Sequence, residues 1–196
     1  MAAERRLLST SPEATEALAE ALGRRLGPGS VLALSGDLGA GKTCFVRGLA
    51  RGLGIEAGVA SPTYLLLQAH EGGRLPLYHF DAWMEGREKA LLADGGAEWL
   101  HGDGVAVVEW AGRVVEWLPT PRLDVHIGHV SPERRTLRLS VRGAGDGPGE
   151  ASGRGPEGAE LDLERILTDL ELPEGILEPD VPRTPGRIPR RPPENP

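Results

Sequence analysis

The sequence has little that would cross-link the chain or hold it in a membrane. Its single cysteine, Cys44, cannot form an internal disulfide, and it fits a small packed residue in a reducing compartment better than a redox group. No continuous apolar run is long enough to cross a lipid bilayer, and the opening MAAERRLLSTSPEA lacks the apolar region of a secretory signal. These absences predict a soluble, cytoplasmic protein without a membrane partner.

An overall excess of positive charge is also missing. The formal net charge is −7 at pH 7, which gives no general attraction to nucleic acid and is compatible only with a local basic patch. We therefore expect no DNA partner. The chain of 196 residues is long enough to bury one hydrophobic core, and its length allows one domain with an appendage.

The composition changes near Arg142. Residues 143–158, GAGDGPGEASGRGPEG, are typical of a linker, and the closing PRTPGRIPRRPPENP is rich in proline and arginine. Between these segments leucine and isoleucine recur at helical spacing, which predicts one short amphipathic helix at about 159–171. We accordingly predict a domain at 1–142 and a poorly ordered, charge-segregated tail at 143–196, whose helix docks on this domain or on a partner.

The stretch SGDLGAGKT, residues 35–43, contains three glycines, a lysine and a threonine, and almost nothing that would fill a core. Its spacing, Gly36-x-x-x-x-Gly41-Lys42-Thr43, matches the P-loop pattern, in which backbone N–H groups surround phosphates, the lysine reaches the terminal phosphates and the hydroxyl binds Mg²⁺. A strand pattern, VLALS, precedes the loop and a helical pattern follows it, as the motif requires. The helix N-terminus adds free N–H groups and a positive dipole end, so the loop is predicted to bind nucleotide phosphates.

The remaining patterns predict alternating helices and strands. Ser11 as N-cap and Pro12 at the first helical position begin an amphipathic helix. Residues 63–83 are predicted as two strands joined by a turn at 71–74, and a polar helical stretch follows at about 87–100. Three further strands are predicted for VAVVEW, RLDVHIG and RTLRLSVR. We therefore predict an α/β fold, a P-loop NTPase three-layer sandwich around a mixed, mainly parallel sheet.

A P-loop enzyme also needs carboxylates near its Mg²⁺. Glu109 follows the apolar run VAVV at a strand end and is the first candidate for binding the metal, directly or through water. Asp81 follows LYHF where another strand should finish, the usual place of functional groups in an α/β sheet. It is expected either as an outer Mg²⁺ ligand or as the group that orients the attacking water. His79, on the same strand, is expected to pack or to form a structural hydrogen bond.

Five segments in this order, SGDLGAGKT, VRGLARGLG, VASPTY, LYHFDAW and VVEW, resemble the TsaE (YjeE) family, the ATPase of bacterial threonylcarbamoyladenosine tRNA modification. The resemblance covers roughly residues 8–142. It implies that the protein binds ATP and Mg²⁺ and hydrolyses ATP slowly, in dependence on partner proteins. Those partners would be the TsaD/TsaB pair, which transfers the threonylcarbamoyl group to adenosine 37 of tRNAs that read ANN codons. The protein would then meet tRNA indirectly, through that complex.

The family's site residues carry over onto matching positions here. Lys42, Glu109 and Asp81 would be catalytic, with Asp81 needed for hydrolysis. Thr43 and Glu109, with Asp81, would bind Mg²⁺. Residues expected to contact the nucleotide are Gly36, Asp37, Leu38, Gly39, Ala40, Gly41, Lys42, Thr43, Cys44, Thr10, Thr63, Trp110 and Arg135.

Four of these positions carry a more specific expectation or an alternative. Thr10 is expected near the adenine and Arg135 near the phosphates. Thr63, in the SPT segment, is either a nucleotide-sensing switch or the start of a strand after a proline. Trp110 either lies by the nucleotide or packs at the strand end.

Two other functions are compatible with a P-loop chain of this length. A small-molecule kinase would need an acceptor pocket and an arginine-bearing lid, and the candidate lid EGREKALLADGG holds a single arginine. An assembly factor that binds ATP with little turnover is motivated by two departures from the family pattern. Trp83-Met84 stand where Tyr-Arg is usual, and AGR follows the Glu-Trp pair where an acid is usual. A GTPase is disfavoured, because the sequence has no Asn-Lys-x-Asp segment.

Overall fold

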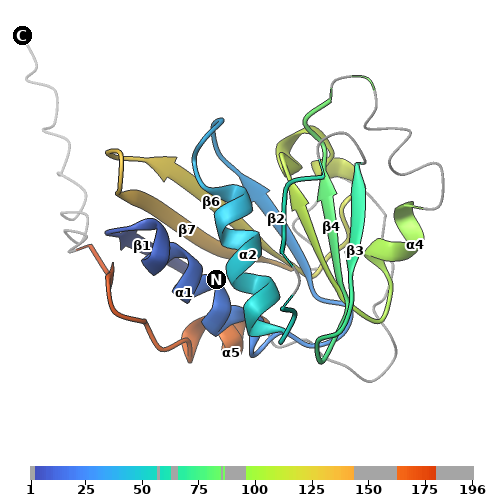
Figure 1. Cartoon of the computed structure of the whole chain (residues 1–196), viewed down its shortest axis with the longest axis horizontal. Coiled ribbons are helices and arrows are strands. Elements are labelled where there is room, and N and C mark those ends of the chain that lie inside the picture. Colours follow the sequence, from blue (N-terminus) through green and yellow to red (C-terminus); the bar gives the residue numbers. More distant parts are fainter. Residues whose placement is uncertain are drawn as a thin grey trace, which may run out of the picture.

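The computed structural model describes residues 3–56, 58–62, 66–84, 86, 96–143 and 163–179, which form one β-sheet with helices packed on it (Figure 1). The elements, in chain order, are β1 (Glu4–Ser9), α1 (Pro12–Gly23), β2 (Val31–Ser35), α2 (Lys42–Gly52), β3 (Leu67–His70), β4 (Leu77–Asp81), α4 (Gly96–Leu100), β5 (Val105–Glu109), the 3₁₀ helices η1 (Ala111–Arg113) and η2 (Val115–Trp117), β6 (Arg122–His129), β7 (Arg135–Arg142), α5 (Leu163–Thr168) and β8 (Ile176–Leu177).

The strands lie in the order β3-β4-β5-β2-β6-β7-β1-β8. The central strands β4, β5, β2 and β6 run parallel, and β2, which leads into the glycine-rich loop, lies between β5 and β6. In this register Glu109 is opposite both Leu34 and Asp81. The carboxyl ends of parallel strands meet at one sheet edge, so the ends of β2, β4 and β5 are placed together there.

The predicted mixed sheet is confirmed, but the expectation that it is mainly parallel is wrong. Among the described strands three neighbouring pairs are parallel and four are antiparallel. The pairs β3–β4 and β6–β7 are hairpins without a crossover helix, which makes each antiparallel. The strand β1 was not predicted, because the half-exposed pattern of ERRLLS gives little periodic signal, and it adds a further antiparallel pairing to β7.

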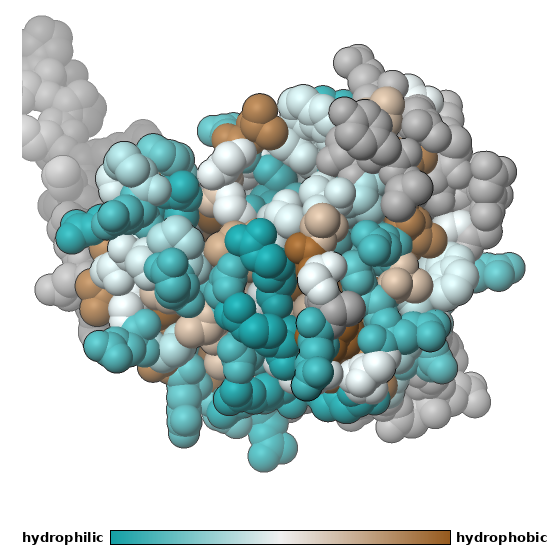
Figure 2. Space-filling model, in the orientation of Figure 1, coloured by the Kyte–Doolittle hydropathy of each residue, from teal (hydrophilic) through white to brown (hydrophobic). Residues whose placement is uncertain are grey.

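Helices α1 and α2 lie side by side over one face of the sheet (Figure 1). As predicted, Ser11 caps α1, since its Oγ accepts a hydrogen bond from the backbone N–H of Ala14 at 3.1 Å. Alternate strand residues such as Leu32 and Leu34 face these helices and share a core with Phe45 of α2. The outer side of this face is mostly hydrophilic (Figure 2), as expected for amphipathic helices.

The opposite face is covered only in part by the described elements. Over β2, β4 and β5 a second core of residues such as Val31 and Phe80 packs against α4, η1 and η2. Over β6, β7 and β1 the same face carries polar side chains. The described residues therefore do not build a complete third layer of helices on this side.

Residues 163–179 pack on the domain rather than apart from it. The predicted tail helix corresponds to α5, whose Leu163 and Leu167 are buried in the same core as α1 and α2. Strand β8 then pairs with β1 through Ile176 and Leu177. The predicted boundary at 142 left this segment outside the domain, because its contacts, with β1, Arg25 and β7, are made with residues remote from it along the chain. The rest of the predicted tail lies outside the described residues.

No helix in the described part of the chain is long and apolar enough to cross a membrane.

Candidate nucleotide site

The glycine-rich loop has the backbone that its sequence predicts. Gly36, Gly39 and Gly41 all have positive φ angles, of 142°, 75° and 108°. A Cβ atom at Gly36 would stand 2.2 Å from the backbone oxygen of Ile127 on β6, so only glycine fits between the loop and the sheet. Gly41 is the N-cap of α2 and provides no side-chain cap, which leaves the N–H groups of the first turn directed at the loop.

Lys42 lies within this loop and is 4% exposed. Its Nζ donates hydrogen bonds of 2.9 Å to the backbone oxygens of Gly36 and Asp37 and lies 3.6 Å from the ring centroid of Trp110. Burial lowers the pKa of Lys42, while the negative charges of Glu109, Asp81 and Asp37 act in the opposite direction. The ammonium group is thus held at the mouth of the loop beside two carboxylates.

The hydroxyl of Thr43 and the carboxylate of Glu109 are in direct contact. Thr43 Oγ1 donates to Glu109, with distances of 2.9 and 3.2 Å to its two oxygens. His79 Nε2 lies 2.9 Å from Glu109 Oε1, and both side chains are almost completely buried. His79 forms the structural hydrogen bond that was expected of it, and it contacts the same Glu109 oxygen as the shorter Thr43 bond.

Asp81 lies next to Glu109 on the neighbouring strand and is 2% exposed. Its Oδ2 accepts a hydrogen bond of 2.6 Å from Ser61 Oγ, and its Oδ1 accepts one of 2.9 Å from the backbone N–H of Trp83. Ser61 belongs to the SPT segment but was not predicted as a site residue. The sequence shows only that Ser61 stands beside Pro62. That position does not indicate a contact with Asp81, which lies twenty residues further along the chain.

Two tryptophans close one side of the site. Trp110 has a φ of 59°, which is rare for a bulky residue and costs of the order of 1–3 kcal/mol. This conformation places its ring against Lys42 and 4.3 Å, centroid to centroid, from the ring of Trp83. The guanidinium of Arg113 lies 5.4 Å from the Trp83 ring centroid. The AGR departure from the family pattern therefore brings a basic group to the site.

These residues line one pocket of about 440 Å³. Its lining residues are Leu38, Gly39, Gly41, Lys42, Thr43, Cys44, Ser61, Asp81, Trp83, Glu109 and Trp110. Arg135 stands beside the pocket, where its Nε donates to the Ala40 backbone oxygen at 2.9 Å and its Nη2 approaches that of Gly39 at 3.4 Å. The loop, both predicted carboxylates and Arg135 are thus brought to one place.

Outside the loop, one expected residue among those described is not seen at the pocket. Thr10 donates from Oγ1 to the Gly175 backbone oxygen at 3.0 Å and is not among the pocket's lining residues, so its role near adenine stays a prediction. Thr63 lies outside the described residues.

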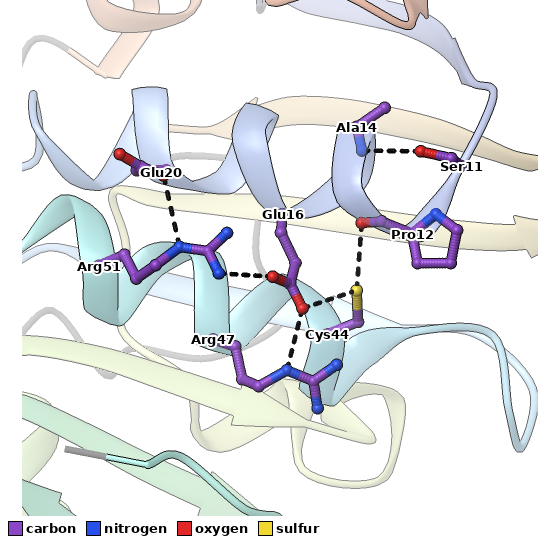
Figure 3. A network of polar contacts seen from close by, with 8 residues as sticks. All are labelled: Ser11, Pro12, Ala14, Glu16, Glu20, Cys44, Arg47 and Arg51. Atoms are coloured by element: carbon purple, nitrogen blue, oxygen red, sulfur yellow. Dashed lines mark hydrogen bonds and ion pairs between the residues drawn. The ribbon is translucent and has the colours of Figure 1, made fainter. Parts of the chain in front are cut away.

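Cys44 is packed between α1 and α2, as expected, although its backbone borders the loop. Its Sγ approaches Pro12 O and Glu16 Oε1, and the same Glu16 binds Arg47 and Arg51 of α2 (Figure 3). Burial and the Glu16 charge raise the pKa of Cys44 to about 11, so the thiol is protonated at neutral pH.

Among the described residues no three His, Cys, Asp or Glu side chains are grouped as a complete metal cage. The Thr43 hydroxyl and the Glu109 carboxylate still offer hard oxygen donors at the start of α2. A Mg²⁺ that accompanies a nucleotide usually needs no more than one or two protein oxygens, because phosphates and waters supply the others. The residues present therefore fit such a metal.

The sequence and the fold are similar to those of known proteins. The model of the family "Threonylcarbamoyl adenosine biosynthesis protein TsaE" matches residues 9–137. The tRNA threonylcarbamoyladenosine biosynthesis protein TsaE of Bacillus subtilis (strain 168) is 42% identical over 136 residues, which are 69% of this chain and 84% of that protein. The protein of the same name from Treponema pallidum (strain Nichols) is 45% identical over 135 residues, 69% of this chain and 99% of that protein.

The crystal structure of Bacillus subtilis YdiB superposes with a TM-score of 0.61 at 36% identity, covering 73% of this chain and 88% of that chain. The family match also contains the loop, both carboxylates and Arg135 described above. The chain therefore belongs to the TsaE family, which takes part in tRNA threonylcarbamoyladenosine biosynthesis.

Proposed function

We propose that the protein is a Mg-ATP-binding P-loop ATPase, slow by itself, that supports N6-threonylcarbamoyladenosine formation on adenosine 37 of tRNAs reading ANN codons together with TsaD/TsaB-type partners. The observation that carries this proposal is the direct contact between Thr43 and Glu109 beside Lys42 in one pocket. A loop of this form with a hydroxyl, a carboxylate and a lysine at one helix N-terminus is suited to a nucleotide with its metal.

In this proposal the phosphates are bound by the backbone N–H groups of residues 36–43, by the helix dipole and by Lys42. Thr43 and Glu109 would hold Mg²⁺, which would neutralise charge on the phosphate oxygens. His79 keeps the Glu109 carboxylate turned toward Thr43, because one of its two oxygens accepts from the imidazole. The guanidinium of Arg135 donates to backbone carbonyl groups of the loop and so supports the shape of the loop.

Asp81 is the proposed positioning group for the attacking water. It is buried and lies one strand from Glu109, and its two oxygens are oriented by Ser61 and by a backbone N–H. A carboxylate fixed in this way keeps a set orientation, which is what positioning a water requires. Cleavage then needs little further chemistry from the protein, because phosphoryl transfer depends mainly on position and electrostatic stabilisation.

The alternatives are an assembly factor with little turnover and a small-molecule kinase. The assembly factor was motivated by the basic residue missing after HFDAW, and Arg113 beside Trp83 supplies a positive charge in that region. The positive charge of Arg113 therefore favours an ATPase with turnover over an assembly factor without it. The kinase would need an arginine-bearing lid, and the candidate lid falls almost wholly outside the described residues. No observation favours the kinase over the ATPase.

The test compares Mg-ATP with Mg-GTP for binding and phosphate release by the purified full chain, alone and then with TsaD, TsaB and tRNA. The proposal expects ATP-selective binding, slow release by the chain alone and a clear rise with the partners. Binding without release under every condition would leave the assembly factor. Release that appears only with a small hydroxylated metabolite would establish the kinase instead.

A further inference from the structure

The sheet face opposite α1 and α2 is exposed over three neighbouring strands. On β6, β7 and β1 every second side chain points into the core, and those between them point to the other side. This polar sheet face consists of Glu4, Arg6, Asp124, His126, Thr136, Arg138, Ser140 and Arg142. No described helix covers it, and His126 and Arg138 are exposed there. A sheet face without a covering layer has a surface free for a partner.

A histidine and two arginines form a row across this face. His126 on β6 is opposite Arg138 on β7, and Arg138 is opposite Arg6 on β1. With strands about 4.8 Å apart, the row from His126 to Arg6 is roughly 10 Å long. Two arginines directly opposite each other on antiparallel strands repel, which is unfavourable for the sheet by itself. The side chain of Arg138 forms no hydrogen bond or ion pair with the part of the chain that the structure describes, so its guanidinium is available to a ligand.

The carboxylates of the same face do not cancel this charge. Asp124 is paired with Arg122 at 2.8 Å and with Arg142 at 2.9 Å, and Glu4 is paired with Arg6 at 2.8 Å. The face therefore carries three arginines, Arg6, Arg138 and Arg142, against two carboxylates, on a chain whose net charge is negative. Such a separation indicates that the positive charge of this face has a specific use rather than a role in general solubility.

A hollow of about 200 Å³ adjoins the row, between the polar sheet face and η1. Its polar lining is made by Ser35, Asp124, His126, Arg138, Ser140 and Arg142, and the Asp124 carboxylate is paired with Arg122 and Arg142. Ser35 Oγ lies 3.0 Å from His126 Nδ1, so the hydroxyl and the imidazole are held together at the wall. Guanidinium, hydroxyl and imidazole groups in one hollow are donors suited to a phosphate.

We propose that the polar sheet face binds the phosphate backbone of RNA directly. The row is long enough to meet more than one phosphate of a strand that rises about 3.4 Å per nucleotide. RNA is favoured over an acidic protein surface because the family acts in the modification of a tRNA. The site lies on the side of the sheet away from the α1 and α2 layer, so the proposal does not depend on ATP hydrolysis in the P-loop pocket.

The experiment measures binding of a fluorescein-labelled tRNA transcript to the full chain by anisotropy, between 50 and 200 mM KCl. The test variant is Arg6→Ala/Arg138→Ala. The control variant, Arg24→Ala/Arg165→Ala, removes the same charge from two exposed arginines on α1 and α5, which pack on the opposite face. We expect the test variant to bind at least tenfold more weakly. The negative slope of log affinity against log salt concentration should become less steep by about 2. The control should change affinity less than twofold.

Equal weakening in both variants would overturn the proposal, because net charge alone would then explain binding. Absence of tRNA binding by the parent chain at 50 mM KCl would overturn it too, as would displacement of tRNA by polyglutamate at the same charge concentration. The single variant Arg138→Gln guards against a folding defect, since the Arg138 side chain has no partner to lose among the described residues. For this variant the salt dependence of tRNA affinity should become less steep by about 1. Mg-ATP affinity of every variant should equal that of the parent, which keeps this test separate from that of the ATPase.

Discussion

Replacing Gly48 by alanine tests how closely the two helices beside the nucleotide pocket must pack. Gly48 lies on α2, and a Cβ atom there would stand 2.2 Å from the backbone oxygen of Glu16 and 2.8 Å from the Cβ of Ala19, both on α1. Neither neighbour is the end of a flexible side chain. The helices would therefore have to move apart to accept one methyl group.

Two opposing contributions decide the result. Alanine in a helix interior is more favourable than glycine by about 0.5–1 kcal/mol, whereas overpacking a core costs about 1–3 kcal/mol. The contact with the Glu16 oxygen is more than 1 Å too short, which places this site at the upper end of that range. We expect a net loss of about 2–2.5 kcal/mol of unfolding free energy, or a Tm lower by about 4–10 °C in a chain of this size.

The measurement is thermal unfolding of the full chain followed by circular dichroism, with Gly112→Ala as the control. A Cβ at Gly112 would meet nothing within 4 Å, so this variant should stay within about 0.5 kcal/mol of the parent. Separation of α1 and α2 should also stretch the Glu16 contacts with Arg47 and Arg51 (Figure 3). A Gly48→Ala protein that melts at or above the parent temperature would refute the argument, because helix propensity would then outweigh packing.

Three further predictions concern the site. Lys42→Ala should abolish nucleotide affinity, whereas Asp81→Asn should keep affinity and lose turnover; equal loss of binding in both would show that Asp81 has a different role. His79→Phe should lower the Mg²⁺ affinity of the nucleotide complex about tenfold, since Glu109 loses one charge-assisted hydrogen bond, and should leave metal-free ATP binding unchanged in a calorimetric titration. Alkylation of Cys44 by iodoacetamide at pH 8 should be about a hundredfold slower in the folded chain than in guanidinium chloride, because its pKa is raised to about 11, and equal rates would show an accessible thiolate.

Most of the loop was predictable from local sequence. Three glycines with positive φ, a lysine and a threonine at fixed spacing determine a backbone that surrounds an anion, and the helix that follows directs its first N–H groups there. Glu109 and Asp81 were also found, because each ends a strongly apolar strand. These signals work at short range, since each depends on residues no more than a few positions away.

The partners of those groups depended on the tertiary structure. The contact of His79 with Glu109 and the contact of Trp110 with Lys42 follow from the sheet order, which places β4 beside β5 and β5 beside β2. Ser61 contacts Asp81 from a segment outside the strands. No local pattern records such a neighbour.

The chain by itself determined the phosphate loop, the strand-end carboxylates and the helix caps, because short stretches of backbone and side chain decide each of them. Only the tertiary structure decided the pairing of β1 with β7, the docking of residues 163–179 and the place of Arg6 opposite Arg138. In each case the residues are far apart in sequence, and their contacts form only when burial of the shared core sets the register of the strands.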